Sequence, residues 1–379
     1  MKCLIIAGDL GITAPGLVYE TIIRELTKYA EISVIVPEKR KDLDLPVAYL
    51  ESADRGFEHI RIAHAFMALC GISLFDEYWV LKQKRILDDN IIKQQDVIIS
   101  LVSFHNYKGL ILGDYLSTKY QKKWVVYSVD AIPAPLGWIK DGLFYRNTCR
   151  FVSNRISRCD AFFSSNEQML HYQLQAMKVL PANIGVVYTP IRSDITIDSF
   201  SVTEYPLFLY TGGLYGPRKK EALLDGFRLL LNDYPKARLV FVGVNRIDFF
   251  EAYKDMLESG NLELHGYTHD LQKFYKSATA LIDINAYFDN DVFLSSKIVN
   301  YLIVKKPIIS ITGLNSPSRN IFKEDISILH CKHNSNEIYQ ALKKVLEYDF
   351  DDWSERKKYI DMFSVENVVK NIVKVLVKI

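Results

Sequence analysis

The sequence predicts an α/β protein built from two doubly wound, Rossmann-like domains that face each other across a cleft. Three observations lead to this prediction. Apolar runs of strand length alternate with helical periodicity in both halves of the chain. Between the halves, the stretch 189–205 is rich in Thr, Ser and Asp and is bracketed by Pro190 and Pro206, as is typical of an interdomain linker. The length of 379 residues also suits two domains better than one.

The first domain is predicted at 1–195 and should form a parallel sheet covered by helices. Its strands are expected at 3–7, 31–36, 96–102, 123–128, 161–164 and 185–187, and helical patterns occupy 17–29, 51–87 and 166–177. Most of these strands are almost wholly apolar, as is typical of parallel strands buried on both faces. The last helical pattern of the chain, within 360–379, is amphipathic and can pack back onto this domain.

A glycine-containing loop, 8–16, follows the first strand at the sheet edge where open α/β sheets bind ligands. It carries Gly11 and Gly16 but not the GxGxxG spacing of dinucleotide-binding domains, so a dinucleotide is not expected. The two glycines either let a substrate come close or form a plain tight turn.

Two polar residues follow other strands of the first domain. His105 comes after the strand at 96–102, and Asp130 comes after the strand at 123–128. Because the carboxyl ends of parallel strands meet at one edge, both loops can face one cleft. Each residue is a candidate general base or orienter of a hydroxyl, and each could equally cap a helix or hydrogen-bond its own loop.

The second domain, predicted at 200–355, repeats the alternation. Its strands are expected at 207–210, 238–242, 262–264, 280–284, 307–311 and 326–329, and helices at 249–259, 270–277, 295–304 and 334–347. A helix with Leu223, Leu224, Phe227 and Leu230 on one face follows the first of these strands.

The turn before that helix is a candidate anion site. It contains Gly212, Gly213 and Gly216, followed by the cations Arg218 and Lys219. Glycine permits close approach of a ligand, and the free N–H groups of a helix start attract negative charge. A glycine-rich turn with solvated cations is the alternative interpretation.

Two further strand ends of this domain could contribute to the same ligand. Ser295, Ser296 and Lys297 open another helix with hydroxyls, a cation and free N–H groups. Gly266 and Tyr267 follow the strand at 262–264, where backbone atoms could contact a base and the aromatic ring could stack on it. Two helix starts with cations suit a diphosphate better than a single phosphate.

Three segments in this order resemble glycosyltransferases with the GT-B fold, of the GT4-like kind. YTGGL at 210–214, with Arg218 and the leucines at 223–224, is similar to their YxGxL…K/R…LL turn. LHGY at 264–267 resembles their xxGY strand end, and SKIVNYLIVKKPII at 296–309 resembles SKxxEYLxxGKPVI. The first half matches chiefly in its glycine turn and in the Asp-x-x-Pro that begins at Asp130.

The resemblance implies an enzyme that moves a sugar from a nucleotide-diphosphate donor, a UDP-sugar being favoured, to a glycan or lipid-linked acceptor in surface polysaccharide assembly. The donor would lie in the second domain and the acceptor mostly in the first. Arg218 would bind phosphate with Lys219 as a second contact, and Ser295, Ser296 and Lys297 would hold the diphosphate. Fixed cations can stabilise this leaving group without a metal. No DxD motif stands where a metal-dependent enzyme needs one; 289–291 reads Asp-Asn-Asp and is interpreted as loop.

The chain departs from the family pattern at two positions. Gly213 stands where many relatives have an arginine that touches phosphate. Asn300 stands where the second glutamate of the E-x7-E pair binds the ribose, and its amide can still hydrogen-bond a hydroxyl. Two alternatives therefore stay open: a catalytically degenerate GT-B scaffold that binds a partner or glycan, and a nucleotide-sugar epimerase.

The bulk properties exclude other classes of protein. A net charge of +2 does not suggest a nucleic-acid binder, and the five scattered cysteines suggest a reducing compartment. Without an apolar run long enough for a signal peptide or a membrane span, a cytoplasmic location is expected.

The basic, aromatic segment 119–158 is either a solvated face or a peripheral contact with the inner face of an anionic membrane. His330, Cys331 and His333 resemble a metal cluster but lack a partner at ligand spacing, and His265 and His269 are interpreted as loop histidines.

Overall fold

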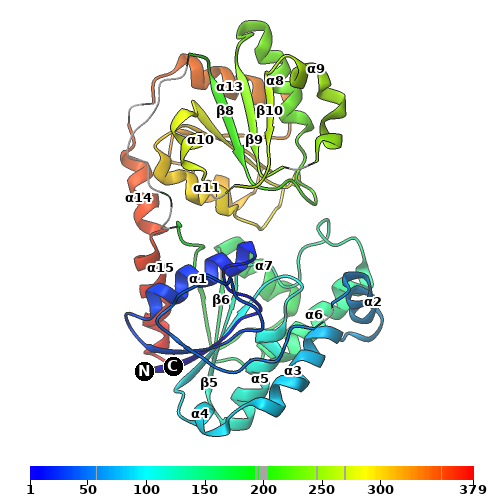
Figure 1. Ribbon diagram of the computed structural model, residues 1–379, viewed down its shortest axis with the longest axis vertical. Coiled ribbons are helices and arrows are strands. Elements are labelled where there is room, and N and C mark those ends of the chain that lie inside the picture. Colours follow the sequence, from blue (N-terminus) through cyan, green and yellow to red (C-terminus); the bar gives the residue numbers. More distant parts are fainter. Residues whose placement is uncertain (57, 193–194, 196–203, 245, 269, 351) are drawn as a thin grey trace. The chain divides into compact units, whose positions relative to one another are not determined.

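The computed structural model describes residues 1–379 except 57, 193–194, 196–203, 245, 269 and 351. Most of the stretch expected as a linker, and His269, therefore lie outside the described residues. The chain divides into two compact units. Unit 1 comprises Met1–Pro190 and Phe363–Ile379, and unit 2 comprises Ile191–Met362. Each unit holds one sheet whose named strand pairs are all parallel, which confirms the predicted fold class (Figure 1).

Unit 1 is built on a seven-stranded sheet in the order β3-β2-β1-β4-β5-β6-β7. The strands are β1 (Lys2–Ile6), β2 (Glu31–Ile35), β3 (Ala48–Tyr49), β4 (Val97–Val102), β5 (Lys123–Ser128), β6 (Ala161–Ser164) and β7 (Asn183–Val186). The helices are α1 (Ala14–Leu26), α2 (Ile60–Cys70), α3 (Leu74–Ile86), α4 (Asp89–Lys93), α5 (Lys108–Tyr120), α6 (Gly142–Ile156), α7 (Glu167–Met177) and α15 (Val365–Leu376). The central strand β4 is buried along its whole length, because helices cover both faces of a doubly wound sheet.

The chain returns to unit 1 at its end. Val368, Val369 and Ile372 of α15 share a core with Ile22 and Ile23 of α1, and Figure 1 shows the two helices side by side. Apolar residues at i, i+1 and i+4 form one face of α15, and burying that face holds the helix against α1.

Unit 2 is built on a six-stranded sheet in the order β10-β9-β8-β11-β12-β13. The strands are β8 (Leu207–Thr211), β9 (Arg238–Val242), β10 (Leu262–His265), β11 (Ala280–Ile284), β12 (Ile308–Ile311) and β13 (Ile328–Cys331). The α-helices are α8 (Glu221–Asp233), α9 (Lys254–Glu258), α10 (Gln272–Ser277), α11 (Ser296–Tyr301), α12 (Pro317–Ile321), α13 (Ser335–Glu347) and α14 (Ser354–Met362). Two 3₁₀ segments, η1 (Ile247–Tyr253) and η2 (Leu302–Val304), complete the unit.

Several elements differ from the sequence prediction. The last strand of unit 2 runs to Cys331 instead of ending at 329, because His330 and Cys331 pair in register with β12. The helix expected at 249–259 begins as the 3₁₀ segment η1. Helices α5 and α14 were not predicted. Helix α14 is strongly polar and lacks an apolar stripe, and its inward-facing residues include Arg356.

Arg356 is the anchor of α14. The side chain is only 1% exposed, and its Nε donates to Asp325 Oδ2 at 2.8 Å. Its remaining nitrogens donate to Lys306 O at 2.7 Å and to the hydroxyl of Ser327. A buried charge is tolerated when it is paired and hydrogen-bonded in this way.

We expect Arg356→Ala to destabilise unit 2 by about 3 kcal/mol or more, because the change leaves the Asp325 carboxylate buried and unpaired. Urea unfolding of the full chain, followed by circular dichroism, measures the loss. Lys357→Ala, which alters an exposed neighbour on the same helix, is the control and should change stability by less than about 0.5 kcal/mol. If the urea midpoint of Arg356→Ala equals that of the unchanged protein, Arg356 does not anchor α14.

Candidate functional site

In unit 2, the carboxyl end of β8 meets the start of α11. Gly212, the first residue after β8, has a φ of 101° and donates its N–H to Val242 O at 2.6 Å. A Cβ at this position would lie 2.6 Å from Cε of Lys297. The glycine is therefore needed for a close approach, and the group that approaches in this structure is the stem of Lys297. Two residues predicted from separate motifs thus come together.

Helix α11 is capped at its start and is linked to the end of β8. Ser295 caps α11, and its Oγ accepts the N–H of Lys297 at 3.2 Å. The hydroxyl of Tyr301 accepts the N–H of Thr211 at 3.0 Å and lies 2.9 Å from Thr211 Oγ1. Tyr301 is fully buried, so this contact is a rigid link between the two segments. The sequence does not indicate this link, since a tyrosine among the apolar residues of a helix does not reveal its hydrogen-bond partner.

Arg218 lies in the same part of unit 2. Its backbone pairs with Ala286, just beyond the end of β11, and its guanidinium carbon lies 4.6 Å from the ring centre of Tyr215. At the same turn, the Tyr210 hydroxyl donates to Gly213 O at 2.9 Å and stabilises the glycine turn. Nζ of Lys297 lies 5.5 Å from the ring centre of Tyr210.

A buried carboxylate completes the cluster. Asp283 in β11 is fully buried, and its Oδ2 accepts Asn285 Nδ2 at 2.7 Å. Its Oδ1 receives no hydrogen bond from any residue that the structure describes. Burial raises the pKa of Asp283, against the opposing effects of Lys297, Ser295, Arg218 and Asn285. An acid inside the apolar run 280–284 was visible in the sequence, but the groups that it faces were not.

The cluster lowers the pKa of Lys297 to about 7. Burial is the main cause, the positive charge of Arg218 adds to it, and the carboxylate of Asp283 opposes both. The pKa of Arg218 is raised, because Tyr215, Tyr210, Asp283 and Asp291 together outweigh the effect of burial. The site therefore places one permanent and one titratable cation at a glycine turn, above a buried acid.

The remaining predicted donor residues also belong to unit 2. Gly266 and Tyr267 are exposed after β10, and Tyr267 is 70% exposed. Lys219 Nζ lies 4.1 Å from the ring centre of Tyr287, and Ser296 is half-buried at the start of α11. Asn300 Oδ1 accepts the N–H of Arg192 at 3.0 Å. The roles of these residues in holding a ligand stay predictions.

Unit 1 holds a cavity of about 540 Å³ at the carboxyl edge of its sheet. Its wall includes both residues predicted from the strand ends, His105 and Asp130, together with Asp9, Thr13 and Asn106. Asp130 Oδ2 accepts the N–H of Phe104 at 3.4 Å. The structure thus brings the two candidate acid–base residues to one cavity.

His105 is held in an unusual backbone conformation among aromatic rings. Its φ is 63°, and its ring centre lies 3.7 Å from that of Phe104 and 5.6 Å from that of Phe144. Burial lowers the pKa of His105 to about 4, and nearby His64 contributes. The imidazole is therefore neutral near pH 7, and the lowered pKa makes it a weaker base than an ordinary histidine.

The two glycines of the first loop accommodate the protein's own side chains. A Cβ on Gly16 would lie 1.9 Å from Asp9 Oδ1, and one on Gly11 would lie 2.9 Å from Glu20 Oε2. Asp9 in turn accepts the N–H and hydroxyl of Thr13 at 3.0 and 2.8 Å. The glycines shape the loop that carries Asp9 and Thr13 to the cavity, and an acceptor contact by Gly11 or Gly16 stays a prediction.

A buried ion-pair network that the sequence did not reveal forms another wall of the cavity. Lys108 is 3% exposed, and its Nζ lies 2.8 Å from Asp76 Oδ1 and 2.7 Å from Glu58 Oε1. Asp76 also accepts the N–H of Tyr107 at 3.0 Å and the hydroxyl of Ser73 at 2.7 Å. The partners are far apart in the chain, so no local sequence motif predicts these ion pairs.

Much of the basic charge at 119–158 is neutralised within unit 1. Four cations of this segment pair with acids: Lys119 with Asp89, Lys123 with Asp160, Arg155 with Glu77, and Arg158 with Asp114. The segment also spans β5 and α6, so it does not form one continuous basic helix.

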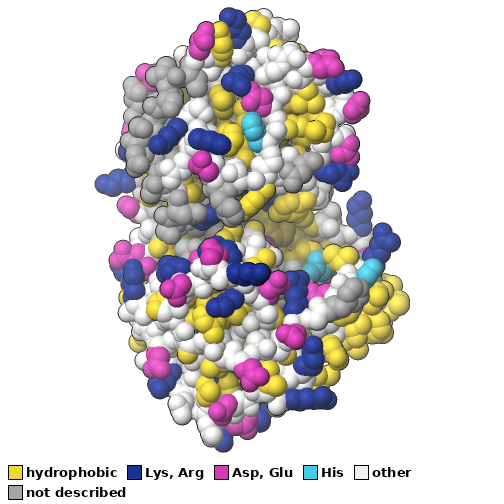
Figure 2. Space-filling model, viewed as in Figure 1, with side chains coloured by type: hydrophobic (Ala, Val, Ile, Leu, Met, Phe, Trp, Pro, Cys, Tyr) yellow, Lys and Arg dark blue, Asp and Glu magenta, His cyan; other side chains and the backbone are white. Residues whose placement is uncertain are grey.

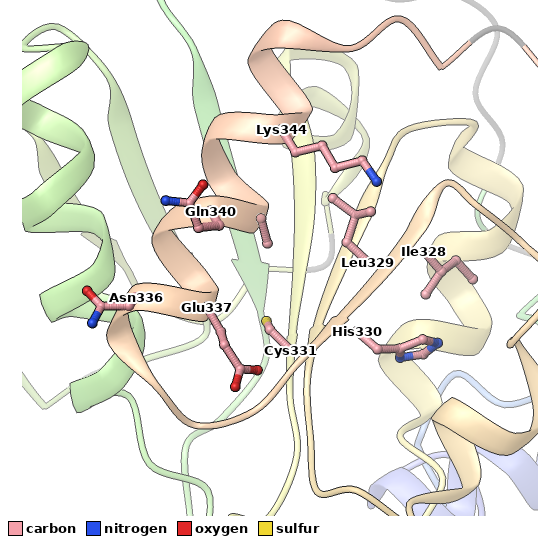
Figure 3. A pocket seen from close by; sticks show the side chains of 9 residues that line it. Ile328, Leu329, His330, Cys331, Asn336, Glu337, Gln340 and Lys344 are labelled. Carbon is pink, nitrogen blue, oxygen red and sulfur yellow. The ribbon is translucent and has the colours of Figure 1, made fainter.

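The histidines of β13 and the loop after it do not form a metal site in the part of the chain that the structure describes, where no group of three His, Cys, Asp or Glu side chains could hold an ion. His330, Cys331 and Glu337 line an open surface pocket of about 530 Å³ between β13 and α13 (Figure 3). Glu337 accepts the N–H of Lys332 at 2.9 Å. None of the described helices is both long and apolar enough to span a bilayer.

Comparisons with known proteins identify the fold. No protein-family model and no curated protein matches the sequence. Among solved structures, HepE of Anabaena in complex with UDP is 12% identical, with a TM-score of 0.68 over 100% of both chains. WaaG, a glycosyltransferase involved in lipopolysaccharide biosynthesis, is 10% identical, with a TM-score of 0.70 over 98% of this chain and 99% of its own. A candidate UDP-N-acetylglucosamine 2-epimerase from Listeria monocytogenes is 13% identical, with a TM-score of 0.57 over 99% and 95%.

These similarities define the class of the fold. The chain has the GT-B fold, with one Rossmann-like sheet in each unit, as the resemblance of its motifs implied.

Proposed function

We propose that the protein is a glycosyltransferase that moves a sugar from a nucleotide-diphosphate donor to a glycan or lipid-linked acceptor in surface polysaccharide assembly. The observation that carries the proposal is the convergence of Arg218 and Lys297 at the Gly212 turn over a buried acid. A UDP-sugar is the favoured donor, and the structures of HepE with UDP and with UDP-glucose support this choice.

In this proposal the cations act on the leaving group. Negative charge grows on the diphosphate as its bond to the sugar breaks, and Arg218 and Lys297 stabilise it without a metal or another cofactor. The diphosphate is bound by Ser295, Ser296 and Lys297, with Lys219 and Gly213 at the turn. The base lies at Gly266 and Tyr267, and Asn300 hydrogen-bonds the ribose.

The acceptor occupies the cavity of unit 1. Asp130 orients or deprotonates the acceptor hydroxyl, and neutral His105 is the second candidate base. Aromatic and apolar side chains such as Phe75, Phe104 and Met67 offer surfaces for a sugar ring. The protein works in the cytoplasm, at the inner face of the membrane.

Calorimetric titration of the full chain with UDP and with GDP tests the proposal. We expect UDP to bind, and more tightly than GDP. If neither nucleotide binds, the proposed enzyme function is contradicted. The alternative, a GT-B scaffold without activity that binds a partner or glycan, would then be favoured.

The similarity to the Listeria protein supports one further candidate, a nucleotide-sugar epimerase. An NMR assay with UDP-N-acetylglucosamine alone separates the two activities. Conversion of the sugar without an acceptor would assign the epimerase, whereas an unchanged stereocentre with UDP binding intact supports transfer.

A further inference from the structure

Helix α2 presents an apolar stripe to solvent. Ile62, Phe66 and Leu69 are spaced i, i+4 and i+7, so they share one face, and they are 43%, 39% and 76% exposed. The buried residues of this helix, Met67 and Ala68, lie on another face. The outer face of a surface helix is normally polar, and a contiguous exposed apolar patch marks an interaction site. Figure 2 shows hydrophobic side chains gathered over α2.

The stripe belongs to a pair of adjacent helices that carry exposed cations. Helix α6 packs beside α2: Asn147 Nδ2 donates to Ala68 O at 2.8 Å, and the rings of His64 and Phe144 stack at 4.2 Å. Neither helix contains Asp or Glu. Their exposed cations are Arg61, Arg146 and Arg150. None of these three forms an ion pair with a described residue, in contrast to Arg155 at the end of α6.

The same helix also lines the cavity of unit 1. Ile60, Ala63 and Met67 of α2 contribute to the cavity wall, and Phe144 of α6 faces it as well. A partner that covers the stripe therefore lies one helix width from the proposed acceptor position.

We infer that the stripe Ile62–Phe66–Leu69, with the exposed cations Arg61 of α2 and Arg146 and Arg150 of α6, docks unit 1 on an anionic lipid bilayer. The apolar side chains enter the boundary between headgroups and acyl chains, and the arginines contact lipid phosphates. Charge complementarity selects this partner, because two adjacent helices without a single acid favour a surface of negative charge. Docking in this way brings the cavity to the membrane, so the acceptor is lipid-linked. This last step rests on the proposed function, whereas the docking does not.

Co-sedimentation of the full chain with vesicles tests the inference. The vesicles are phosphatidylcholine alone, or phosphatidylcholine mixed with phosphatidylglycerol. We expect binding to the mixed vesicles that falls by about tenfold or more in the triple variant Ile62→Gln, Phe66→Gln, Leu69→Gln. A second variant, with Arg61, Arg146 and Arg150 changed to Gln, should lose the preference for phosphatidylglycerol.

The matched control changes three exposed apolar residues outside the stripe to Gln: Leu180, Ile247 and Ile326. It should bind the vesicles as the unchanged protein does. Equal binding of the stripe variant and the control, or no binding of the unchanged protein, would overturn the inference. Light scattering provides a second test. If the unchanged protein is a dimer and the stripe variant is a monomer, a second copy of the chain covers the stripe, and the inference is overturned.

Titration of each protein with UDP separates this inference from the proposed function. The stripe variant should keep the UDP affinity of the unchanged protein, because its three residues lie in unit 1 and do not line the cavity. If the protein binds vesicles but not UDP, the proposed glycosyltransferase function is contradicted and the docking surface is supported. If it binds UDP but not vesicles, the docking surface is contradicted and the proposed function is supported.

Discussion

Arg218→Ala should weaken UDP binding by about 100-fold, because a guanidinium–phosphate contact is charge-assisted and commonly bidentate. Arg218 is half-buried at the turn after β8, where its pKa is raised and its charge is permanent. Its backbone is fixed by the pairing with Ala286, so little ordering accompanies binding. Calorimetric titration with UDP gives the two dissociation constants directly.

Two further variants control this experiment. Lys357→Ala removes an exposed cation of unit 2 on α14 and should leave UDP affinity unchanged. Arg218→Lys keeps a charge but loses the two-pronged geometry, and we expect an intermediate loss of about tenfold. Equal affinities for Arg218→Ala and the unchanged protein would exclude Arg218 from the diphosphate site.

UDP binding should weaken as the pH rises through about 7, because the pKa of Lys297 is lowered to about 7 in the free protein. The protonated amine attracts the diphosphate, and the neutral amine does not. Affinity is therefore greatest where Lys297 is charged, below that pKa, and is lost progressively above it until the pKa of the bound state is passed. Lys297→Arg keeps its charge at every pH tested and should abolish this part of the pH dependence.

Asp283→Asn should move this loss of affinity to lower pH. The carboxylate of Asp283 is the group that opposes the lowering of the Lys297 pKa by burial and by Arg218. Without it, Lys297 loses its proton more readily, while repulsion between Asp283 and the diphosphate also disappears. We expect UDP to bind as tightly as in the unchanged protein, or more tightly, near pH 6, and about tenfold more weakly near pH 8.

The UDP-affinity profiles of Asp283→Asn and of the unchanged protein should therefore cross between pH 6 and pH 8. Such a crossing distinguishes an electrostatic role of Asp283 from a structural one. A variant that merely loosens β11 would bind more weakly at every pH. The double variant Asp283→Asn, Lys297→Arg should restore affinity above neutral pH, since arginine does not titrate there. Parallel profiles for Asp283→Asn and the unchanged protein would show that Asp283 does not control Lys297.

The parts of the donor site that sequence could predict are those with local signals. An apolar strand run, three glycines and clustered cations mark the turn that carries Arg218, and Ser295 before Lys297 marks a capped helix start. The alternation of such patterns also predicts both parallel sheets. Neither motif predicts that Lys297 lies against Gly212, since the two motifs are separated by three strands along the chain.

What the sequence could not reveal depends on partners far apart in the chain. Asp283 appears only as an acid in an apolar run, and its position below Lys297 follows from the pairing of β11 with β8. The network of Lys108 with Asp76 and Glu58 joins three separate segments. The buried Arg356 makes the polar helix α14 an integral part of unit 2, against the usual association of burial with apolar residues.

The central claim is that Arg218 and Lys297 bind one diphosphate at the Gly212 turn. A crystal structure of the full chain with UDP tests it most directly. We predict that oxygen atoms of the two phosphates lie within hydrogen-bond distance of both side chains, about 2.7–3.2 Å. Phosphates placed elsewhere in the structure, out of hydrogen-bond reach of Arg218 and Lys297, would contradict the account.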